Sequence, residues 1–234
     1  MIINILTING VDVADAVAQI PPTSEQLSFS LIEMAFKGGW IMLPLLALSI
    51  LTLYIFGERW WAIRKASQID ENFMRNIHDY IHEGKIKAAV NLCQTQETPI
   101  ARLIEKGVER IGRPLNDIQT AVENMGNLEV SRLEKGLPIL ATIAGGAPMI
   151  GFLGTVIGMI QAFYNMSQAG SNVDITLLSG GIYTAMVTTV AGLIVGIFAY
   201  FGYNYLTARI DNIVYKMESN TIEFMDLLHE PANK

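Results

Sequence analysis

The chain has 234 residues, of which only 16% are charged and 51% are hydrophobic. A balance this apolar argues against an ordinary soluble domain and indicates a protein of the lipid bilayer. The formal net charge is −6, and no basic stripe runs along the sequence, so nucleic acid is not expected as a partner.

Three long segments contain no charged residue, and they lie at 38–57, 136–173 and 175–208. Each is about long enough, or longer than needed, to cross roughly 30 Å of hydrocarbon as a helix. The first is followed by Glu58-Arg-Trp-Trp61, whose aromatic pair and cation are typical of the point where a helix leaves the membrane. The sequence therefore predicts an all-α membrane protein with three transmembrane helices.

Lysine and arginine are distributed unevenly, and short basic segments resist translocation. Residues 1–36 contain none, and the connection between the second and third segments contains none, whereas twelve fall between Arg59 and Lys135. We therefore expect the N-terminus and the second connection to lie outside, with the middle segment and the C-terminal tail in the cytoplasm. The first residues lack a basic start and a small-residue cleavage pattern, so we expect them to be retained.

Helix-breaking residues divide the middle segment. Gly84 ends one stretch, Thr98-Pro99 opens another, and Gly112-Arg-Pro114 precedes a last helix that runs towards Lys135. These breaks predict a cytoplasmic bundle of three or four helices. The tail from Arg209 is expected to continue the third transmembrane helix. In the last helix before Lys135, we expect an apolar face (Ile118, Val122, Met125, Leu128, Leu133) and a polar face (Glu123, Glu129, Arg132, Glu134).

The second and third transmembrane segments sort their side chains by size. At 100° per residue, the small residues of each fall within an arc of roughly 120–140°. Glycine costs a helix about 1 kcal/mol relative to alanine, but in lipid it lets helix backbones approach closely. These stripes are too extensive for one helix pair, which predicts a homo-oligomer. The candidate helix-packing residues are Gly151, Gly154, Gly158, Gly181, Gly192 and Gly196.

Four threonines accompany these glycines: Thr155, Thr184, Thr188 and Thr189. A hydroxyl at membrane depth must bond its own backbone or face protein or water. Bonding to its own backbone is the usual state of an isolated threonine, whereas four threonines on facing stripes favour a shared polar path.

The sequence contains no Walker loop, nucleophile elbow or HExxH motif, so it does not indicate an enzyme or a cofactor. His78 and His82 are four residues apart but lack a third ligand, and we interpret them as a solvated helix face rather than a metal site. Cys93 is the one cysteine, which excludes an intrachain disulfide and predicts a buried thiol.

Two motifs, "APMIGFLGTVIGMIQAF" and "GIYTAMVTTVAGLIVGIFAYFGYNYL", follow a first span that ends in "ERWWAIRKA" and a stretch that reads "AVNLCQTQETPIARLIEKGVER". Together they resemble the MotA/TolQ/ExbB family, and most of all its ExbB members, over residues 37–228. The resemblance implies the ring-forming subunit of an inner-membrane motor driven by the proton motive force. It also implies a pentamer whose pore holds the single transmembrane helices of a dimeric ExbD-type partner, which energises a TonB-like protein and outer-membrane transport.

Carried over by position, the family's pore-facing threonines fall on Thr155 and Thr189. The family's characteristic glutamate of the third span falls on Thr184, so none of the three spans contains a carboxylate. The resemblance then implies that the partner's aspartate carries the proton, and that hydroxyls and water complete the path. Thr188 lies on the same stripe and is a further candidate pore-lining residue.

Two alternatives to the ExbB-type motor remain: a TolQ-like or other stator motor subunit with the same chemistry, and a non-conducting oligomeric membrane scaffold. The missing carboxylate favours the scaffold, and the facing threonines count against it. The expected organisation is a periplasmic segment at 1–36, transmembrane helices at 37–59, 137–165 and 179–207, a cytoplasmic helical domain at 60–136, a periplasmic loop at 166–178 and a cytoplasmic helix and tail at 208–234.

Overall fold

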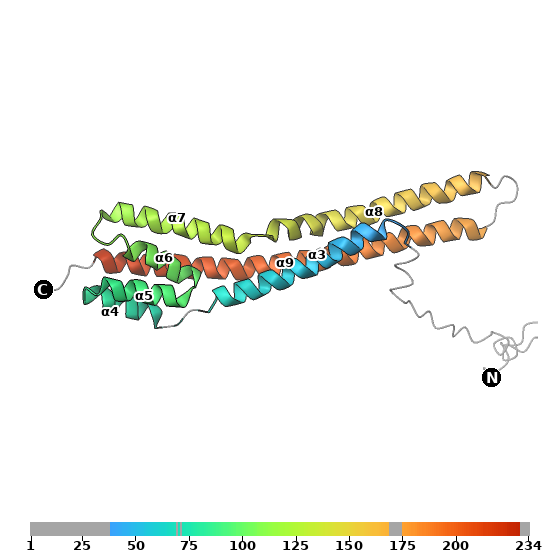
Figure 1. Cartoon of the computed structure of the whole chain (residues 1–234). Helices are drawn as coiled ribbons and strands as arrows, with labels where there is room; N and C mark the ends of the chain where they lie inside the picture. The colour runs from blue at the N-terminus through green and yellow to red at the C-terminus, as the bar shows by residue number, and fades with distance from the viewer. Residues whose placement is uncertain (1–37, 69, 71, 169–174, 230–234) are drawn as a thin grey trace, which may run out of the picture. The chain divides into compact units, whose positions relative to one another are not determined.

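The structure is a computed structural model, and it describes residues 38–68, 70, 72–168 and 175–229. Every regular element in these ranges is an α-helix (Figure 1). The expectations for residues 1–36 lie outside the described residues. The helices are α3 (Met42–Ala66), α4 (Phe73–His82), α5 (Ile86–Gln96), α6 (Pro99–Val108), α7 (Leu115–Glu134), α8 (Leu137–Gln168) and α9 (Ile175–His229).

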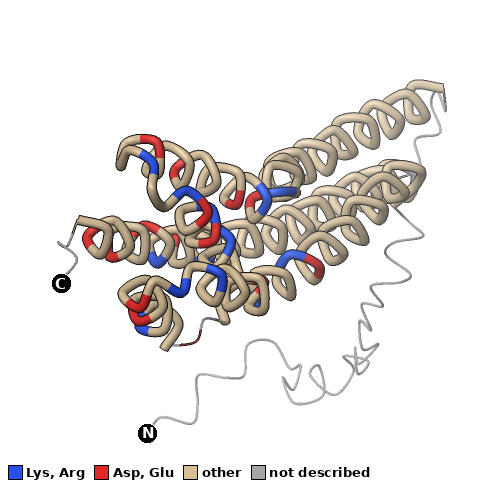
Figure 2. Tube along the Cα trace, turned by 60° about the vertical axis from the view of Figure 1, so that its left-hand side comes forward, with Lys and Arg blue, Asp and Glu red and all other residues tan. Residues whose placement is uncertain are grey.

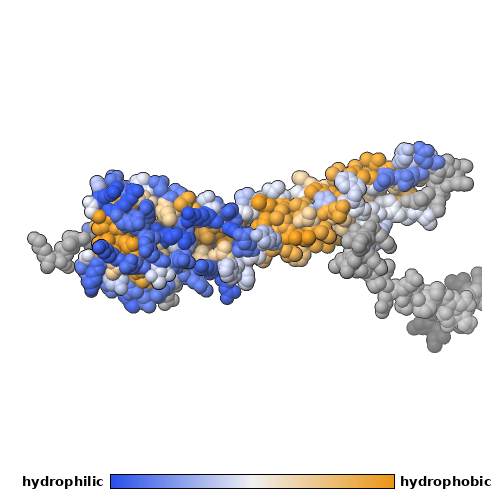
Figure 3. Space-filling view, in the orientation of Figure 1, coloured by the Kyte–Doolittle hydropathy of each residue, from blue (hydrophilic) through white to orange (hydrophobic). Residues whose placement is uncertain are grey.

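Three helices among the described residues are long and apolar enough to cross a membrane, and they include α3, α8 and the first half of α9. These three segments lie side by side (Figure 1). On the face shown in Figure 3, hydrophobic residues cover much of the surface of these segments, while the surface over α4 to α7 and the end of α9 is mainly hydrophilic. The protein is therefore a multi-pass membrane protein with an all-helical fold.

The last helix, α9, continues without a break from the apolar region into the polar one, as the absence of glycine and proline between Tyr203 and Glu230 predicts. Its 55 residues rise by about 1.5 Å each, so it is about 80 Å long. In the polar region, it buries an apolar stripe against α4, α6 and α7 (Figure 1). The buried members of this stripe include Leu206, Ile210, Ile213, Met217 and Phe224.

The short helices of the bundle begin and end at the expected residues. The side-chain oxygen of Thr98 accepts a hydrogen bond of 3.2 Å from the backbone N–H of Ala101, and Pro99 occupies the first turn of α6. Gly84 and Gly112 follow α4 and α6 with positive φ angles of 70° and 97°, which favour glycine. These positions fold the chain between Phe73 and Leu115 into three short helices, of which α4 and α6 contact α9, while α5 packs against α4 and α6.

Two details of the bundle bear on function. The helix α3 does not end where the charges begin but continues to Ala66, so Arg59, Arg64 and Lys65 belong to the same helix as the first span. The polar face expected on α7 is wrong at one position, because Glu129 is only 1% exposed.

Candidate proton path between α8 and α9

The contact between α8 and α9 is formed where glycines of the two helices face each other. A Cβ atom placed on Gly192 would lie 2.6 Å from the backbone oxygen of Ala147 and 2.9 Å from the Cα of Gly151. A Cβ on Gly151 would lie 2.8 Å from the backbone oxygen of Thr188. Backbone atoms cannot move aside as a flexible side chain can, so the two helices keep this separation only with glycine at both positions.

The other four candidate glycines extend the same contact. A Cβ on Gly181 would lie 2.5 Å from the Cβ of Ala162, and one on Gly158 would lie 2.9 Å from the Cβ of Ala185. A Cβ on Gly154 would overlap Thr188, and one on Gly196 would lie 2.6 Å from the Cγ of Pro148. The small residues of both helices thus pack against each other within one chain. The expectation that they are too extensive for one helix pair is wrong, and they are no argument for contact with a second copy.

Thr188 lies at the centre of this contact and is 1% exposed. Its hydroxyl donates to the backbone oxygen of Ala185 over 2.7 Å and lies 3.4 Å from the backbone oxygen of Gly151. Bonding to its own helix satisfies the hydroxyl inside the apolar contact. This geometry places Thr188 between the two helices and not on an open face.

Thr155 and Thr189 flank the contact and are partly exposed. The Thr189 hydroxyl donates across the helices to the backbone oxygen of Gly151 over 3.0 Å, and the Thr155 hydroxyl donates to the backbone oxygen of Phe152 over 2.6 Å. Each hydroxyl retains acceptor lone pairs, which can bind water or a donor from another chain.

The position of α3 separates the threonines into two groups. Leu45 of α3 forms one hydrophobic cluster with Ile143 of α8 and Ala199 of α9, and Ile150, Ala191 and Val195 pack against that cluster. At 100° per residue, Thr155 lies about 120–140° around α8 from Ile143 and Ile150. Thr189 lies about 120–160° around α9 from Ala191 and Val195.

Thr184, in contrast, lies within about 20° of Ala191 and Val195 on α9. Thr155 and Thr189 therefore occupy the side of the helix pair away from α3, while Thr184 lies on the α3 side. The single polar path expected through all four threonines is not formed within one chain. Apolar side chains are exposed on the side away from α3, where Phe152, Met186 and Leu193 are 65%, 62% and 45% exposed.

Three further residues singled out by the sequence lie in the bundle, far along the chain from this contact. The rings of His78 and His82 of α4 contact each other in a tilted arrangement, with centroids 4.3 Å apart and an interplanar angle of 51°. The described residues hold no group of three side chains that could bind a metal ion. The sulfur-bearing side chain of Cys93 is 1% exposed in the bundle core, as predicted.

The family model described as the MotA/TolQ/ExbB proton channel family matches residues 95–219, from the end of α5 into the polar part of α9. This segment is more than half of the chain and includes both facing helices. The chain belongs to this family.

Individual members of the MotA/TolQ/ExbB family are similar over most of the chain. A protein of Methanothermobacter thermautotrophicus described as an ExbB homologue is 30% identical over 81% of this chain and 67% of its own length. An ExbB-like protein of Synechocystis is 32% identical over 76% of this chain and 71% of its own. The Tol-Pal system protein TolQ of Pseudomonas aeruginosa is 24% identical over 82% of this chain and 88% of its own.

Membership of the MotA/TolQ/ExbB family makes the protein a transport or motor subunit and not an enzyme. The family also implies partners of the ExbD or TolR type in a stator complex. Similarity to both ExbB and TolQ proteins at about this level does not separate the two kinds of output.

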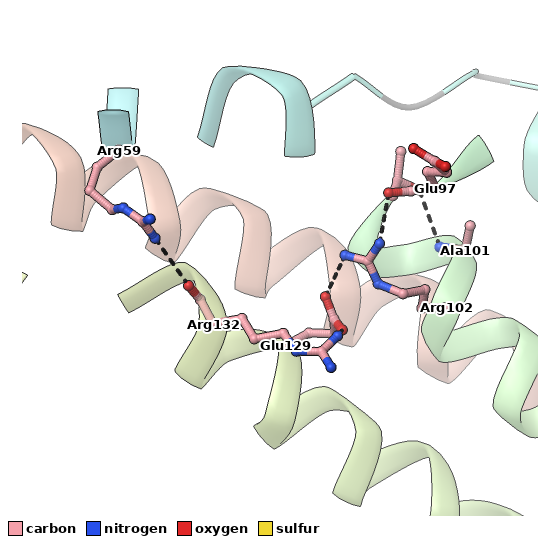
Figure 4. Close-up of polar contacts among 7 residues, drawn as sticks. Arg59, Glu97, Ala101, Arg102, Glu129 and Arg132 are labelled. Atoms are coloured by element: carbon pink, nitrogen blue, oxygen red, sulfur yellow. Dashed lines mark hydrogen bonds and ion pairs between the residues drawn. The ribbon is translucent and has the colours of Figure 1, made fainter. Parts of the chain in front are cut away.

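Sequence reasoning missed one buried ionic cluster, which joins the membrane helices to the bundle. The two carboxylate oxygens of Glu129 accept from Arg102 of α6 and from Arg132 of α7, each over 2.6 Å (Figure 4). Arg102 also donates to the backbone oxygen of Glu97 over 2.9 Å, and Arg59 of α3 donates to the backbone oxygen of Arg132 over 3.4 Å. Helical spacing placed Glu129 among polar residues, and only the approach of α6 shows that it is enclosed.

Proposed function

We propose that the protein is the ring-forming subunit of an ExbB-type motor driven by the proton motive force. With an ExbD-type partner it would energise a TonB-like protein and thereby outer-membrane transport. The observation that best supports this is the pair of hydroxyls, Thr155 and Thr189, on an apolar side of α8 and α9 that α3 leaves uncovered. A face that carries many apolar side chains and the hydroxyls of Thr155 and Thr189, and no charged group, suits a pore that excludes ions but can hold a few water molecules.

In this proposal, five copies surround the two transmembrane helices of a partner dimer, with the uncovered side of α8 and α9 towards the pore. The partner supplies the membrane carboxylate, because residues 38–57, 136–173 and 175–208 contain no acidic side chain, and Asp174 falls between the last two segments. Thr155 and Thr189 bind the water through which the proton reaches that carboxylate. Thr184, on the other side of α9, is expected to affect the path less.

The proposed orientation places the N-terminus in the periplasm and the bundle and C-terminus in the cytoplasm of a bacterial inner membrane. Figure 2 shows that the charged residues of the described part gather on the bundle and are absent from most of the membrane helices. The lysines and arginines among them are the residues that retain a segment in the cytoplasm.

A TolQ-like motor is the alternative that the similarity to the TolQ protein of Pseudomonas aeruginosa supports. It would use the same ring and the same threonines with a different output. A non-conducting scaffold is supported only by the absence of a carboxylate in the spans.

The test is to purify the chain in mild detergent together with the product of a neighbouring gene that encodes a single-span protein with a membrane aspartate. The intact mass of the complex is then measured. A complex of five copies with two partner chains is expected. A ring that binds no such partner would favour the scaffold, and a neighbouring gene for a TonB-like protein would separate the ExbB-type output from the TolQ-type output.

A further inference from the structure

A pocket of about 420 Å³ lies between the end of α3 and the middle of α9. Its floor is apolar, with Ile63, Leu206 and Ile213 at 4%, 0% and 2% exposure. Its walls are polar and basic, and they include Trp60, Arg64, Ser67, Tyr205, Arg209 and Lys216. Among the described residues, none of those that line it carries a carboxylate.

The residues of α3 and α9 that line the pocket indicate its depth in the membrane. On α3, Trp60 and Arg64 follow directly after the uncharged segment that ends at Gly57. On α9, Arg209 is the first charged residue after the uncharged segment that ends at Ala208. Two helices thus change from apolar to charged at the same pocket, and tryptophan and tyrosine are the residues enriched at the headgroup level of a bilayer. The pocket therefore opens among the lipid headgroups on the side of the bundle.

Two of the three cations that line the pocket, Arg64 and Arg209, lie over aromatic rings. The guanidinium of Arg64 lies 5.6 Å from the centre of the Trp60 ring, and that of Arg209 lies 5.4 Å from the centre of the Tyr205 ring. Arg209 also donates from Nε and Nη2 to the Tyr205 hydroxyl, over 3.3 and 3.2 Å. In the described part of the chain, neither arginine forms an ion pair with a carboxylate.

This arrangement leaves donors and positive charge available for an anion. A guanidinium has five N–H donors, and contact with a ring face uses none of them in full. Arginines that are oriented but not neutralised are suited to binding phosphate with two parallel hydrogen bonds. Lys216 is not proposed as a main ligand, because it also lines a neighbouring pocket that contains Asp70 and Glu223.

We propose that this pocket binds the phosphate of an anionic phospholipid headgroup, with Arg64 and Arg209 as its main ligands. The acyl chains would extend along the apolar surface of α3 and α9, and the headgroup would join the two helices at the membrane surface. Clusters of cations between membrane helices at this depth are known to favour anionic headgroups. The inference needs only a membrane protein of this fold, and it does not depend on proton-driven function.

The test uses the full chain in its purified complex, in a mild non-ionic detergent. Phosphatidylglycerol and the zwitterionic phosphatidylcholine are added separately, and bound lipid per chain is counted by native mass spectrometry. Arg64→Gln with Arg209→Gln removes the two main cations, and the same pair changed to lysine keeps the charge. Lys87→Gln with Arg113→Gln removes two exposed cations that line neither this pocket nor the neighbouring one.

The parent and the Lys87/Arg113 control are expected to prefer phosphatidylglycerol equally. Each cation is expected to contribute about fivefold to the affinity for phosphatidylglycerol, so the change of both arginines to glutamine should weaken that affinity about 30-fold. The change of both to lysine should retain most of the affinity. Equal binding of the two lipids by the parent, or an equal loss in the control, would overturn the proposal. Inorganic phosphate is added in a separate arm. If millimolar phosphate displaces phosphatidylglycerol, the pocket binds free phosphate and the assignment to a lipid is wrong.

Discussion

The hydroxyl of Thr189 in α9 donates a hydrogen bond of 3.0 Å to the backbone oxygen of Gly151 in α8. The bond can form only because both helices have glycine where their backbones meet, at Gly151 and Gly192. One pair of residues thus combines the two features of the stripes: close packing by glycine, and a hydroxyl at the edge of the contact.

The packing role is tested by adding a single methyl group to this contact. Gly192→Ala puts a Cβ 2.6 Å from the backbone oxygen of Ala147, so the helices must move apart. We expect a loss of about 1–3 kcal/mol in the free energy of unfolding, as for other overpacked sites. The measurement is reversible unfolding in mixed micelles of mild and denaturing detergent.

Gly145→Ala is the matched control for that substitution. It lies in α8, and outside its own helix backbone a Cβ at this position would have no atom of the described residues within 4 Å. Alanine should then leave stability unchanged or raise it by up to about 1 kcal/mol, because alanine is the better helix former. An equal loss of stability in both variants would mean that the α8–α9 contact is not the reason for glycine at position 192.

The buried carboxylate of Glu129 is expected to hold α6 to α7 within the bundle. Glu129→Gln removes a carboxylate that is 1% exposed and accepts from two arginines. The arginine side chains are 35% and 57% exposed and can be solvated, so the loss should be about 2–3 kcal/mol, below the usual range for a fully buried pair.

Glu123→Gln is the control on the same helix, because Glu123 is exposed and accepts from a glutamine only. Its effect on the thermal unfolding of the purified protein should stay within about 0.5 kcal/mol. If the two variants unfold at the same temperature, Glu129 does not stabilise the bundle.

Cys93 is expected to resist thiol reagents in the folded protein. Burial, with a smaller contribution from the nearby Glu105 carboxylate, raises the pKa of the thiol from 9.0 to about 12. The thiolate, which is the reactive form, is therefore scarce at pH 8. Labelling by a maleimide should be slow until denaturant is added, and rapid labelling of the folded protein would contradict the burial of this side chain.

The same shift predicts how stability depends on pH. The folded state keeps the Cys93 proton up to a pKa of about 12, whereas the unfolded thiol releases its proton near 9.0. The contribution of this group is fully present below pH 9 and declines as the pH rises towards 12. Cys93→Ser should remove this part of the decline at high pH.

The proposed orientation is tested by single cysteines on the background of this unreactive thiol. A cysteine at Ser171, between the second and third spans, should react with an impermeant maleimide in intact spheroplasts. A cysteine at Asn116, an exposed position in α7, should react only after lysis. The reverse pattern would invert the proposed topology.

The sequence was sufficient for the number of spans and for most helix ends. The length of an uncharged segment is enough to identify a membrane helix. Thr98, Pro99 and Gly112 begin or end helices through local effects, so these helix ends can also be predicted without knowledge of the tertiary fold. The continuity of α9 was equally predictable, because no residue after Gly202 and before Glu230 interrupts a helix.

The burial of Glu129 and the division of the threonines were not predictable from one helix at a time. Glu129 is enclosed because Arg102, 27 residues earlier in the chain, approaches it from α6. Thr184 and Thr189 belong to one stripe on α9, and only the position of α3 separates them. Periodicity indicates which residues share a face, but the neighbouring helix determines what that face contacts.

The central claim is that a proton passes along the side of α8 and α9 that bears Thr155. It is tested most directly by proton flux into vesicles that contain this chain with its ExbD- or TolR-type partner. Thr155→Val keeps the volume but removes a partly exposed hydroxyl, and Thr142→Val is the control, an exposed threonine of α8 that also bonds its own helix, over 2.8 Å. We expect both variants to bind the partner, with flux unchanged in Thr142→Val and at least about fivefold lower in Thr155→Val, as loss of one polar contact of about 1 kcal/mol implies. Flux in Thr155→Val equal to that of the parent, or parent flux that does not require the partner's membrane carboxylate, would contradict the account.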